Sequence, residues 1–309
     1  MEVSSFSAKP RVYFGGSSFK ESVPLKRVKL PAWHQRFVPI SSNGRTMKSL
    51  LECTVRRETC VKVFCCQKTE ISFVAARSMI EIYDSLAERL LPTAAVASNP
   101  NAKHIVALAG PPGAGKSTLA SEVVQRVNKL WPQRASAFDE QVNPPNVATV
   151  LPMDGFHLYR SQLDAMEDPK EAFARRGAQW TFDPVPLLKC LKTLRSEGSV
   201  YAPSFDHGVG DPVEDDIFVS LQQKVVIVEG NYLLLEEGVW KDVSSMFDEK
   251  WFIDVDIDTA MTRVLRRHIS TGKPPDVAKW RIDYNDRPNA ELIMKSKKNA
   301  NLVIKSIDF

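Results

Sequence analysis

Short apolar runs alternate along the chain with longer stretches in which apolar residues recur every three or four positions. The apolar runs predict buried strands at residues 104–109, 147–153, 225–228, 251–255 and 302–304. The three-to-four spacing predicts helices at residues 79–90, 119–130, 184–197 and 258–272. Strands that alternate with helices predict an α/β fold, with a five-stranded parallel sheet covered by helices on both faces.

Polar residues mark the ends of these elements and the links between them. Asp183 and Pro184 have the residue types of an N-cap and a first helical residue, and Asp258 is the N-cap expected for the later helix. Residues 131–145 predict a polar, proline-bearing link. Residues 201–216, rich in Pro, Gly and Asp, predict a loop.

A glycine-rich loop lies between the strand at 104–109 and the helix that follows. It fits the GxxxxGK(S/T) pattern, with Gly110, Gly115, Lys116 and Ser117 in the defining places. Glycines let backbone N–H groups converge on one anion, and the helix adds its positive N-terminal end. Pro111 and Pro112 cannot donate, so the cradle beyond Gly110 must come from Gly113, Ala114, Gly115, Lys116, Ser117 and Thr118.

This loop predicts a nucleoside triphosphate site in a P-loop NTPase three-layer fold. Lys116 would reach the β- and γ-phosphates, and the Ser117 hydroxyl would be a ligand of Mg²⁺. Two acidic residues, Asp154 and Glu229, stand where the next two strands end. In open parallel sheets ligands bind beyond the carboxyl ends of the strands, so we expect both carboxylates beside the loop.

In this order the motifs resemble those of the P-loop small-molecule kinases that include uridine kinase, phosphoribulokinase and pantothenate kinase. The resemblance runs from about residue 102 to 304 and rests on residues 110–118, Met153-Asp154-Gly155-Phe156, residues 201–207, Val228-Glu229-Gly230 and the Arg-rich residues 263–268. It implies a kinase domain at residues 71–309, with a core at 102–305 and a lid at about 266–290. The implied activity transfers the γ-phosphoryl group of ATP, with Mg²⁺, to a hydroxyl group of a small metabolite.

The resemblance also implies roles for single residues. Asp154 would be the base for the acceptor hydroxyl, and Glu229 would hold Mg²⁺ through water. Arg266 or Arg267 would stabilise the transferring phosphoryl group beside Lys116. The alternatives are a turn-capping Asp154, a structural Glu229 and solvated arginines on a helix surface. The closely spaced Arg-Asp pair of the uridine kinase lid does not occur in this sequence.

The acceptor is less sharply implied. Phe205-Asp206 resembles the Tyr-Asp of the uridine kinase substrate loop, and His207 stands near the position of a later histidine in that loop. The other residues that could face the acceptor are His157, Tyr159, Arg175 and Arg176. A uridine-like nucleoside is the first acceptor expected. Pantothenate or a sugar follows, because Asp154-Gly155-Phe156 is nearer to the pantothenate kinase motif. The alternative is a nucleotide-binding regulatory protein or an ATPase without kinase turnover, and GTP as donor is left open.

Composition changes the picture mainly at the N-terminus. The chain of 309 residues carries a net charge of +4, but its first 50 residues hold nine basic and two acidic residues. The remaining residues therefore carry a net charge of −3, which does not favour nucleic-acid binding. The basic, Ser-rich, acid-poor residues 1–70 predict a transit peptide, for a chloroplast before a mitochondrion. The alternative is a disordered extension of a cytoplasmic protein.

Three further features bear on partners. No apolar run reaches the roughly 18 residues of a membrane span, so no membrane partner is expected. Four of the five cysteines lie in or just after the tail with no histidine near them, which does not favour a zinc site. The expected partner is therefore a small-molecule substrate, and a homodimer is left open.

Overall fold

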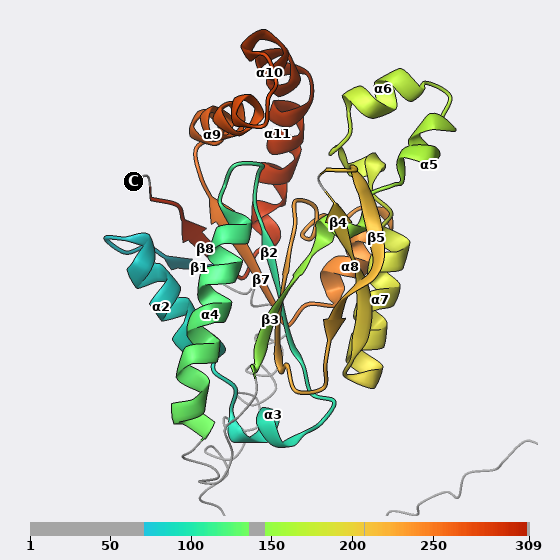
Figure 1. Cartoon of the computed structure of the whole chain (residues 1–309). Coiled ribbons are helices and arrows are strands. Elements are labelled where there is room, and N and C mark those ends of the chain that lie inside the picture. The colour runs from blue at the N-terminus through green and yellow to red at the C-terminus, as the bar shows by residue number, and fades with distance from the viewer. Residues whose placement is uncertain (1–70, 136–145, 207, 308–309) are drawn as a thin grey trace, which may run out of the picture. The chain divides into compact units, whose positions relative to one another are not determined.

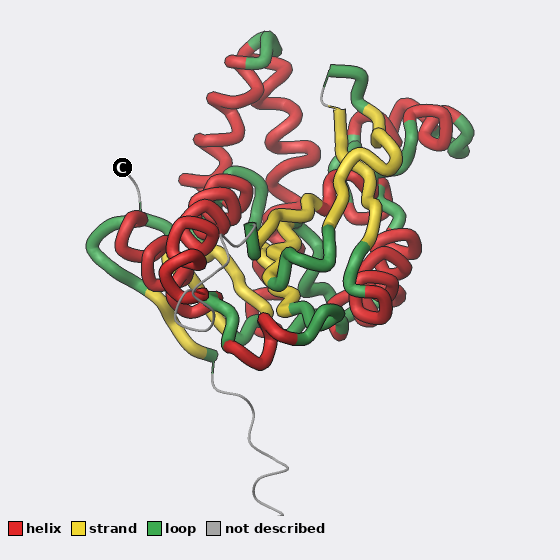
Figure 2. The backbone as a smooth tube through the Cα atoms, turned by 60° about the horizontal axis from the view of Figure 1, so that its bottom comes forward, coloured by secondary structure: helices red, strands yellow, loops and turns green. Residues whose placement is uncertain are grey.

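The computed structural model describes residues 71–135, 146–206 and 208–307 (Figure 1). The predicted transit peptide at residues 1–70, most of the predicted link at 131–145, and His207 lie outside these residues. The described chain has three layers, with helices on both faces of a parallel sheet (Figure 2). The predicted fold class is therefore confirmed.

The middle layer is a six-stranded parallel sheet in the order β1-β8-β7-β2-β6-β3. Its strands are β1 (Ser72–Val74), β2 (His104–Ala109), β3 (Ala148–Pro152), β6 (Val225–Glu229), β7 (Glu249–Asp254) and β8 (Leu302–Lys305). Five of them confirm the predicted strands, but the predicted total of five was wrong. The additional strand, β1, is too short to show an apolar run, and it is a strand because it pairs with residues 302–304 of β8 at the sheet edge.

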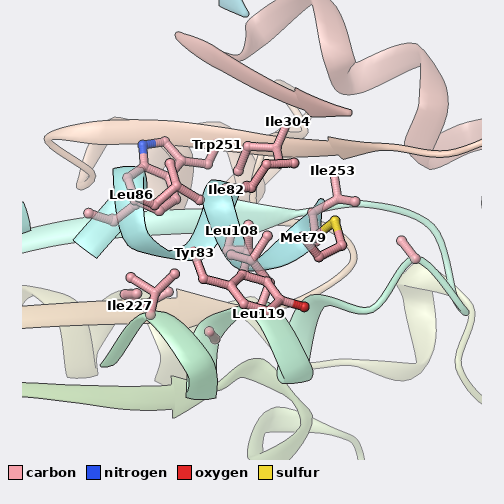
Figure 3. Packing of buried hydrophobic residues seen from close by; sticks show 14 of the residues in the cluster. Met79, Ile82, Tyr83, Leu86, Leu108, Leu119, Ile227, Trp251, Ile253 and Ile304 are labelled. Carbon is pink, nitrogen blue, oxygen red and sulfur yellow. The ribbon is translucent and has the colours of Figure 1, made fainter. Parts of the chain in front are cut away.

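Alternate residues of the central strands point to opposite faces, and each face has its own core. Val106 and Leu108 of β2 pack with α2 (Met79–Leu90), α4 (Lys116–Ala135) and α9 (Ile257–Ser270). Figure 3 shows part of this core, where Ile82 and Leu86 of α2 lie near Trp251 of β7. Residues 105 and 107 of β2 instead pack with α7 (Pro184–Glu197) and α8 (Gly238–Ser245).

The remaining elements lie between the core elements or above the sheet. They are α3 (Ala94–Ser98), η1 (Met153–Phe156), α5 (Arg160–Asp164), α6 (Pro169–Ala174), η2 (Gln179–Thr181), α10 (Pro275–Arg281), η3 (Ile282–Asp286), α11 (Arg287–Lys295) and η4 (Ser296–Asn299). Residues of the predicted lid fall in α9, α10, η3 and α11, which rise above one end of the sheet, opposite α5 and α6 (Figure 1). Every helix in the described part of the chain is too short or too polar to cross a membrane.

Two predicted helices are confirmed at both ends, and two differ. Asp183 caps α7 by accepting from the N–H of Val185, and Gly198 ends that helix in a left-handed conformation. The predicted start of the link at residues 131–145 is wrong, because α4 continues to residue 135 and the buried side chain of Trp131 packs in the core. The predicted cap Asp258 is also wrong, because Asp256 accepts from the N–H of Thr259 and caps α9 two residues earlier than expected.

The predicted loop at residues 201–216 is mostly wrong, because the chain forms an antiparallel hairpin there. Its strands are β4 (Val200–Asp206) and β5 (Asp211–Val219). Proline is tolerated because the sheet has only two strands, and Pro203 lies at the register shift between Ala202 and Ser204. The side chain of Asp206 accepts from the N–H groups of Gly208 and Val209, which closes the turn between the strands.

Glu249 ties α2 to the sheet, and its removal is expected to destabilise the fold. Its carboxylate accepts from Trp251 Nε1 and from Arg89 Nε of α2, each at 2.8 Å, and lies 3.4 Å from His104 Nε2. Burial alone would raise the pKa of Glu249, but these donors together lower it to about 2. Because the folded pKa lies below the ordinary value of 4.5, the stabilisation is complete above pH 4.5 and is lost as the pH falls towards 2.

We therefore expect Glu249→Gln to lower the free energy of unfolding at pH 7 by about 1.5–3 kcal/mol, the usual contribution of a hydrogen bond to a charged group. The difference from the wild type should shrink as the pH falls below 4.5. Denaturant unfolding at several pH values measures both effects. Glu88→Gln, at an exposed position of the same α2, is the matched control. A loss that does not change with pH would show that the carboxylate charge is not its source.

Candidate functional site

The loop between β2 and α4 is tight because two of its glycines adopt left-handed backbone conformations. Gly113 has a φ of 81° and Gly115 a φ of 90°. Gly113 also lies against α9, where an added Cβ would be 2.4 Å from the backbone oxygen of Ala260. A larger residue would push the loop away from α9, so the glycine is needed both for the turn and for this close packing.

Lys116, the first residue of α4, folds back over this loop. Its Nζ donates to the backbone oxygens of Gly110 at 2.9 Å and Pro111 at 3.1 Å. Desolvation is the largest effect on Lys116 and lowers its pKa, nearby Glu229 and Asp154 raise it, and Arg267 lowers it. The ammonium therefore lies among two carboxylates and one guanidinium that the sequence places far apart.

Ser117, next to Lys116 in α4, is in direct contact with Glu229 at the end of β6. Ser117 Oγ donates to Glu229 Oε1 at 2.9 Å. Burial raises the pKa of Glu229 and Asp154 raises it further, whereas Lys116 and the Ser117 hydrogen bond lower it. The hydrogen bond links the two predicted ligands of Mg²⁺ to each other.

The chemistry of these two residues fits Mg²⁺. A hydroxyl and a carboxylate are the hard oxygen donors that this ion prefers. Among the described residues no group of three or more His, Cys, Asp or Glu side chains could hold a metal ion by itself. This also fits, because Mg²⁺ is commonly held by one or two protein oxygens together with phosphates and water.

One cavity of about 380 Å³ brings most of the predicted catalytic residues together. Its walls are Pro112, Gly113, Gly115, Lys116, Ser117, Thr118, Asp154, Glu229, Gly230, Asn231, Arg263, Val264 and Arg267. It therefore joins the phosphate-binding loop, the ends of β3 and β6, and one face of α9. The convergence of Asp154 and Glu229 at the loop, expected from the strand ends, is confirmed.

Arg263 and Asn231 line this cavity, although neither was predicted as a site residue. Arg263 Nη1 donates to the backbone oxygen of Gly113 at 3.2 Å. A signal for Arg263 was present in the sequence, because residues 263 and 267 are one helical turn apart and share a face of α9. Asn231 follows Glu229 closely, but no sequence pattern distinguishes it from an ordinary loop residue.

The two candidate lid arginines face different cavities. Arg267 lines the cavity that holds Lys116. Arg266 lines an adjoining cavity of about 540 Å³, whose walls are Met79, Tyr83, Ala114, Gly115, Thr118, Thr259, Thr262, Arg263, Arg266, Ser306 and Ile307. The second cavity thus continues from the phosphate-binding loop towards α2, and Arg267 is the better placed of the two arginines beside Lys116 and Asp154.

Asp154 occupies η1, directly after β3. Its backbone oxygen accepts from the N–H of His157 at 3.2 Å and lies 2.8 Å from His157 Nδ1, so the main chain closes this turn. Its carboxylate interacts electrostatically with Lys116 and Glu229. This arrangement favours a role in the cavity over the alternative of a turn-capping carboxylate.

His157 and Phe205, two predicted acceptor residues, lie side by side. Their ring centroids are 4.6 Å apart, and His157 also packs on Phe182 at 3.9 Å. The guanidinium of Arg176 lies 5.5 Å from the centroid of the Phe205 ring. These residues therefore form one group that joins the hairpin to the segment after Asp154.

Asp206 does not join this group through its carboxylate. That carboxylate is engaged in the hairpin turn with Gly208 and Val209, which gives Asp206 a structural role there. Tyr159 lines a third cavity of about 290 Å³, between η1, α7 and the hairpin, and His157 lines it too. The predicted residue His207 lies outside the described residues.

Known proteins are similar to most of the described chain. Residues 105–308 match the sequence model of the "Phosphoribulokinase / Uridine kinase family". A Schizosaccharomyces pombe protein provisionally named uridine kinase C227.14 is 36% identical over 208 residues, which cover 66% of this chain and 83% of that protein. The Aspergillus versicolor "ATP-dependent kinase-like protein notR'" is 42% identical over 152 residues, 47% of this chain and 88% of that protein.

A solved structure has the same fold. The crystal structure of a provisionally named fructose transport system kinase from Silicibacter sp. TM1040 superposes with a TM-score of 0.59 at 29% identity. The match covers 74% of this chain and 99% of that structure. The similarity therefore spans the sheet, the phosphate-binding loop and the helices around the site.

The first test of the site is the loss of the Lys116 ammonium. We expect Lys116→Ala to weaken the binding of ATP with Mg²⁺ by about 10- to 100-fold, since a hydrogen bond to a charged group contributes about 1.5–3 kcal/mol. Isothermal titration calorimetry measures this affinity. Lys129→Ala, at an exposed position of the same α4, should bind as the wild type does. Equal affinity of the Lys116 variant and the wild type would contradict a phosphate site at this loop.

Proposed function

The chain belongs to the phosphoribulokinase/uridine kinase family, and from this premise we propose that it is an ATP-dependent kinase that phosphorylates a hydroxyl group of a small metabolite. The observation that carries the proposal is the single cavity shared by Lys116, Asp154, Glu229 and Arg267. A phosphate-binding loop alone would serve many nucleotide-binding proteins. A second carboxylate in the same cavity, one that is not hydrogen-bonded to Ser117 as Glu229 is, is what transfer to an acceptor requires.

The two adjoining cavities form the binding site that we propose for ATP. The triphosphate lies over the loop, within reach of Lys116, and the nucleoside extends into the cavity next to α2, which Tyr83 and Arg266 line. Ser117 and Glu229 would hold Mg²⁺, which when bound neutralises charge on the phosphate oxygens. This placement leaves the space beside Asp154 for the acceptor.

The transfer follows from the positions of these side chains. The Asp154 carboxylate accepts the proton of the acceptor hydroxyl as its oxygen forms a bond to the γ-phosphorus. The bond from that phosphorus to the bridging oxygen of ADP breaks, and ADP leaves with the electron pair. Lys116 and Arg267 stabilise the negative charge on the oxygens of the transferring group. Most of the rate enhancement then comes from positioning and from charge stabilisation.

The acceptor is a separate part of the proposal. The sequence favours a uridine-like nucleoside first, and pantothenate or a sugar next. The names of the similar proteins do not agree on one of them, since one mentions uridine and another fructose transport. The acceptor must therefore be found by experiment.

The experiment is a test of ADP formation by the full chain with ATP and Mg²⁺, against nucleosides, pantothenate, sugars and glycerate. We expect one acceptor to stimulate ADP formation and to appear as its phosphorylated product in mass spectrometry. Tight ATP binding without stimulation by any acceptor would instead favour a nucleotide-binding regulatory protein.

Asp154 is tested by replacing its carboxylate with an amide. Asp154→Asn should lower turnover by at least about a hundredfold, the usual contribution of a general base, while ATP affinity stays near that of the wild type. Steady-state rates and calorimetry measure the two quantities. Asp164→Asn, at an exposed position of α5, is the matched control. Unchanged turnover in the Asp154 variant would rule this residue out as the base.

The two neighbouring arginines are expected to differ because they line different cavities. Arg267→Ala should lower kcat by about a hundredfold, as the loss of one donor to a transition-state oxygen does. Arg266→Ala should act mainly on the KM for ATP. Each variant serves as the control for the other in the same kinetic assay. Equal effects of both on kcat would contradict the assignment of Arg267 alone to the phosphoryl group.

A further inference from the structure

Arginine side chains cross between the lid helices and the segment that follows Asp154. Arg175 and Arg176 form the turn after α6, and Arg281 is the last residue of α10. Arg175 Nη1 donates to the backbone oxygen of Tyr284 in η3 at 2.7 Å. Arg281 Nη2 donates in the opposite direction, to the backbone oxygen of Arg176 at 3.5 Å. The two guanidiniums therefore lie at the same junction, each held by the other's segment.

Hydrogen bonds and ring contacts order the junction. Asn285, which is 1% exposed, donates to the same backbone oxygen of Arg176 at 3.0 Å. Tyr284 donates its hydroxyl to Glu171 of α6 at 2.6 Å, and its ring lies 5.5 Å from the Arg175 guanidinium. These contacts hold the arginines in place. The groups that contact the guanidiniums of Arg175 and Arg281 directly, an aromatic ring and backbone oxygens, carry no net negative charge.

The hydrogen-bonding capacity of these arginines is only partly used. The Nε atoms of Arg175, Arg176 and Arg281 are all buried and have no hydrogen-bond partner within the described residues. Buried donors are nearly always paired in native proteins, so three such atoms in one cluster require an explanation. They are the only buried side-chain nitrogen atoms in the described part of the chain with this property.

The positive charge of the cluster is also poorly balanced. In the described ranges, neither Arg175 nor Arg281 has a carboxylate within 4.0 Å, and Arg176 has only Asp211 at 3.5 Å. Of the acidic residues near the junction, Asp286 contacts His268 at 2.8 Å and Glu171 accepts from Tyr284, and neither forms an ion pair with Arg175 or Arg281. Two partly buried guanidiniums without a counter-ion favour an anion between them.

The cluster lies next to the acceptor side of the site. The buried hydroxyl of Tyr232 donates to the backbone oxygen of Gly177, the residue after Arg176, at 2.6 Å. Burial raises the pKa of that hydroxyl, Arg175 lowers it, and Asp286 and Asp154 raise it, so charges from the junction and from Asp154 both act on Tyr232. Arg176 Nη2 in turn donates to the backbone oxygen of Leu158, four residues after Asp154. An acceptor with its hydroxyl at Asp154 could therefore extend towards the arginines.

We propose that the acceptor carries an anionic group, a carboxylate or a phosphate, and that Arg175 and Arg281 hold this group from the two sides of the junction. The inference rests on the proposed kinase function and specifies its substrate class. Arg176 is a positioning residue, because its backbone oxygen anchors Arg281 and Asn285. A neutral nucleoside then becomes a poorer acceptor than a hydroxy acid or a sugar phosphate.

Matched acceptor pairs test the substrate class. The full chain is assayed with glycerate against glycerol, pantothenate against pantothenyl alcohol, and ribulose 5-phosphate against ribulose. We expect at least one anionic member to be phosphorylated at least about tenfold faster than its neutral partner, since charge-assisted hydrogen bonds are about twice as strong as neutral ones. The first two pairs report on a carboxylate and the third on a phosphate. Equal rates within the pair that contains the best acceptor would overturn the inference and leave the kinase function standing.

Variants test the two arginines. Arg175→Gln and Arg281→Gln should each raise the KM for the anionic acceptor at least about tenfold while the KM for ATP changes little, and Arg281→Lys should retain part of the affinity. Lys279→Gln, at an exposed position of the same α10, is the matched control. A rise in KM that is equal for anionic and neutral acceptors would overturn the inference, because it would mean that the arginines only hold the lid in place.

A binding measurement separates this inference from the proposed function. Inorganic phosphate is added to the full-length Lys116→Ala variant, whose phosphate-binding loop is impaired, and the thermal midpoint is recorded. A rise that is lost when Arg281→Gln is added would support the anion site even if no acceptor were ever phosphorylated. The absence of any rise, together with neutral acceptors that are phosphorylated as well as anionic ones, would overturn the anion site while the kinase function holds.

Discussion

The parallel pairing of β2 and β3 with β6 aligns the carboxyl ends of these three strands, and the phosphate-binding loop, Asp154 and Glu229 all lie at those ends. Glu229 lies in register with Leu108 of β2 and with Pro152 of β3. The phosphate-binding loop starts two residues after Leu108, and Asp154 stands two residues after Pro152. Parallel strands end at the same edge of the sheet, so the phosphate-binding loop, Asp154 and Glu229 come together there. No pattern that links distant parts of the sequence is needed to bring them together.

Opposite charges at this edge of the sheet partly offset the effect of burial on each other's pKa. Desolvation lowers the pKa of Lys116 and raises that of Glu229, so each group is less easily charged than in water, and each offsets part of that effect in the other. Arg267 adds positive charge beside Lys116, and Arg175 and Arg281 add more where the turn after α6 meets α10 and η3. Positive charge in these two places suits the transfer that we propose, between ATP and an anionic acceptor.

The segment before the family match contributes to the same structure. Helix α2 lies outside residues 105–308, yet its apolar face packs with α4 and the sheet in one core (Figure 3). Met79 and Tyr83 of this helix also line the cavity that continues from the phosphate-binding loop. A segment outside the residues that match the family model thus forms one wall of the space that we assign to the nucleoside.

The sequence by itself determined the elements whose signals are local. Apolar runs located five strands, helical spacing and caps located α2 and α7, and the glycine and lysine spacing located the phosphate-binding loop. It also placed Asp154 and Glu229 at the correct sheet edge, because strand order along the chain is enough for that inference.

Only the tertiary structure decided what depends on pairing between distant residues. β1 is a strand because of β8, the hairpin forms although its prolines suggest a loop, and α4 extends past residue 131 because Trp131 is buried. The choice between Arg266 and Arg267, the recruitment of Arg263 and the meeting of Arg175 with Arg281 all follow from how α9 and α10 pack, and helix packing leaves no local pattern in the sequence.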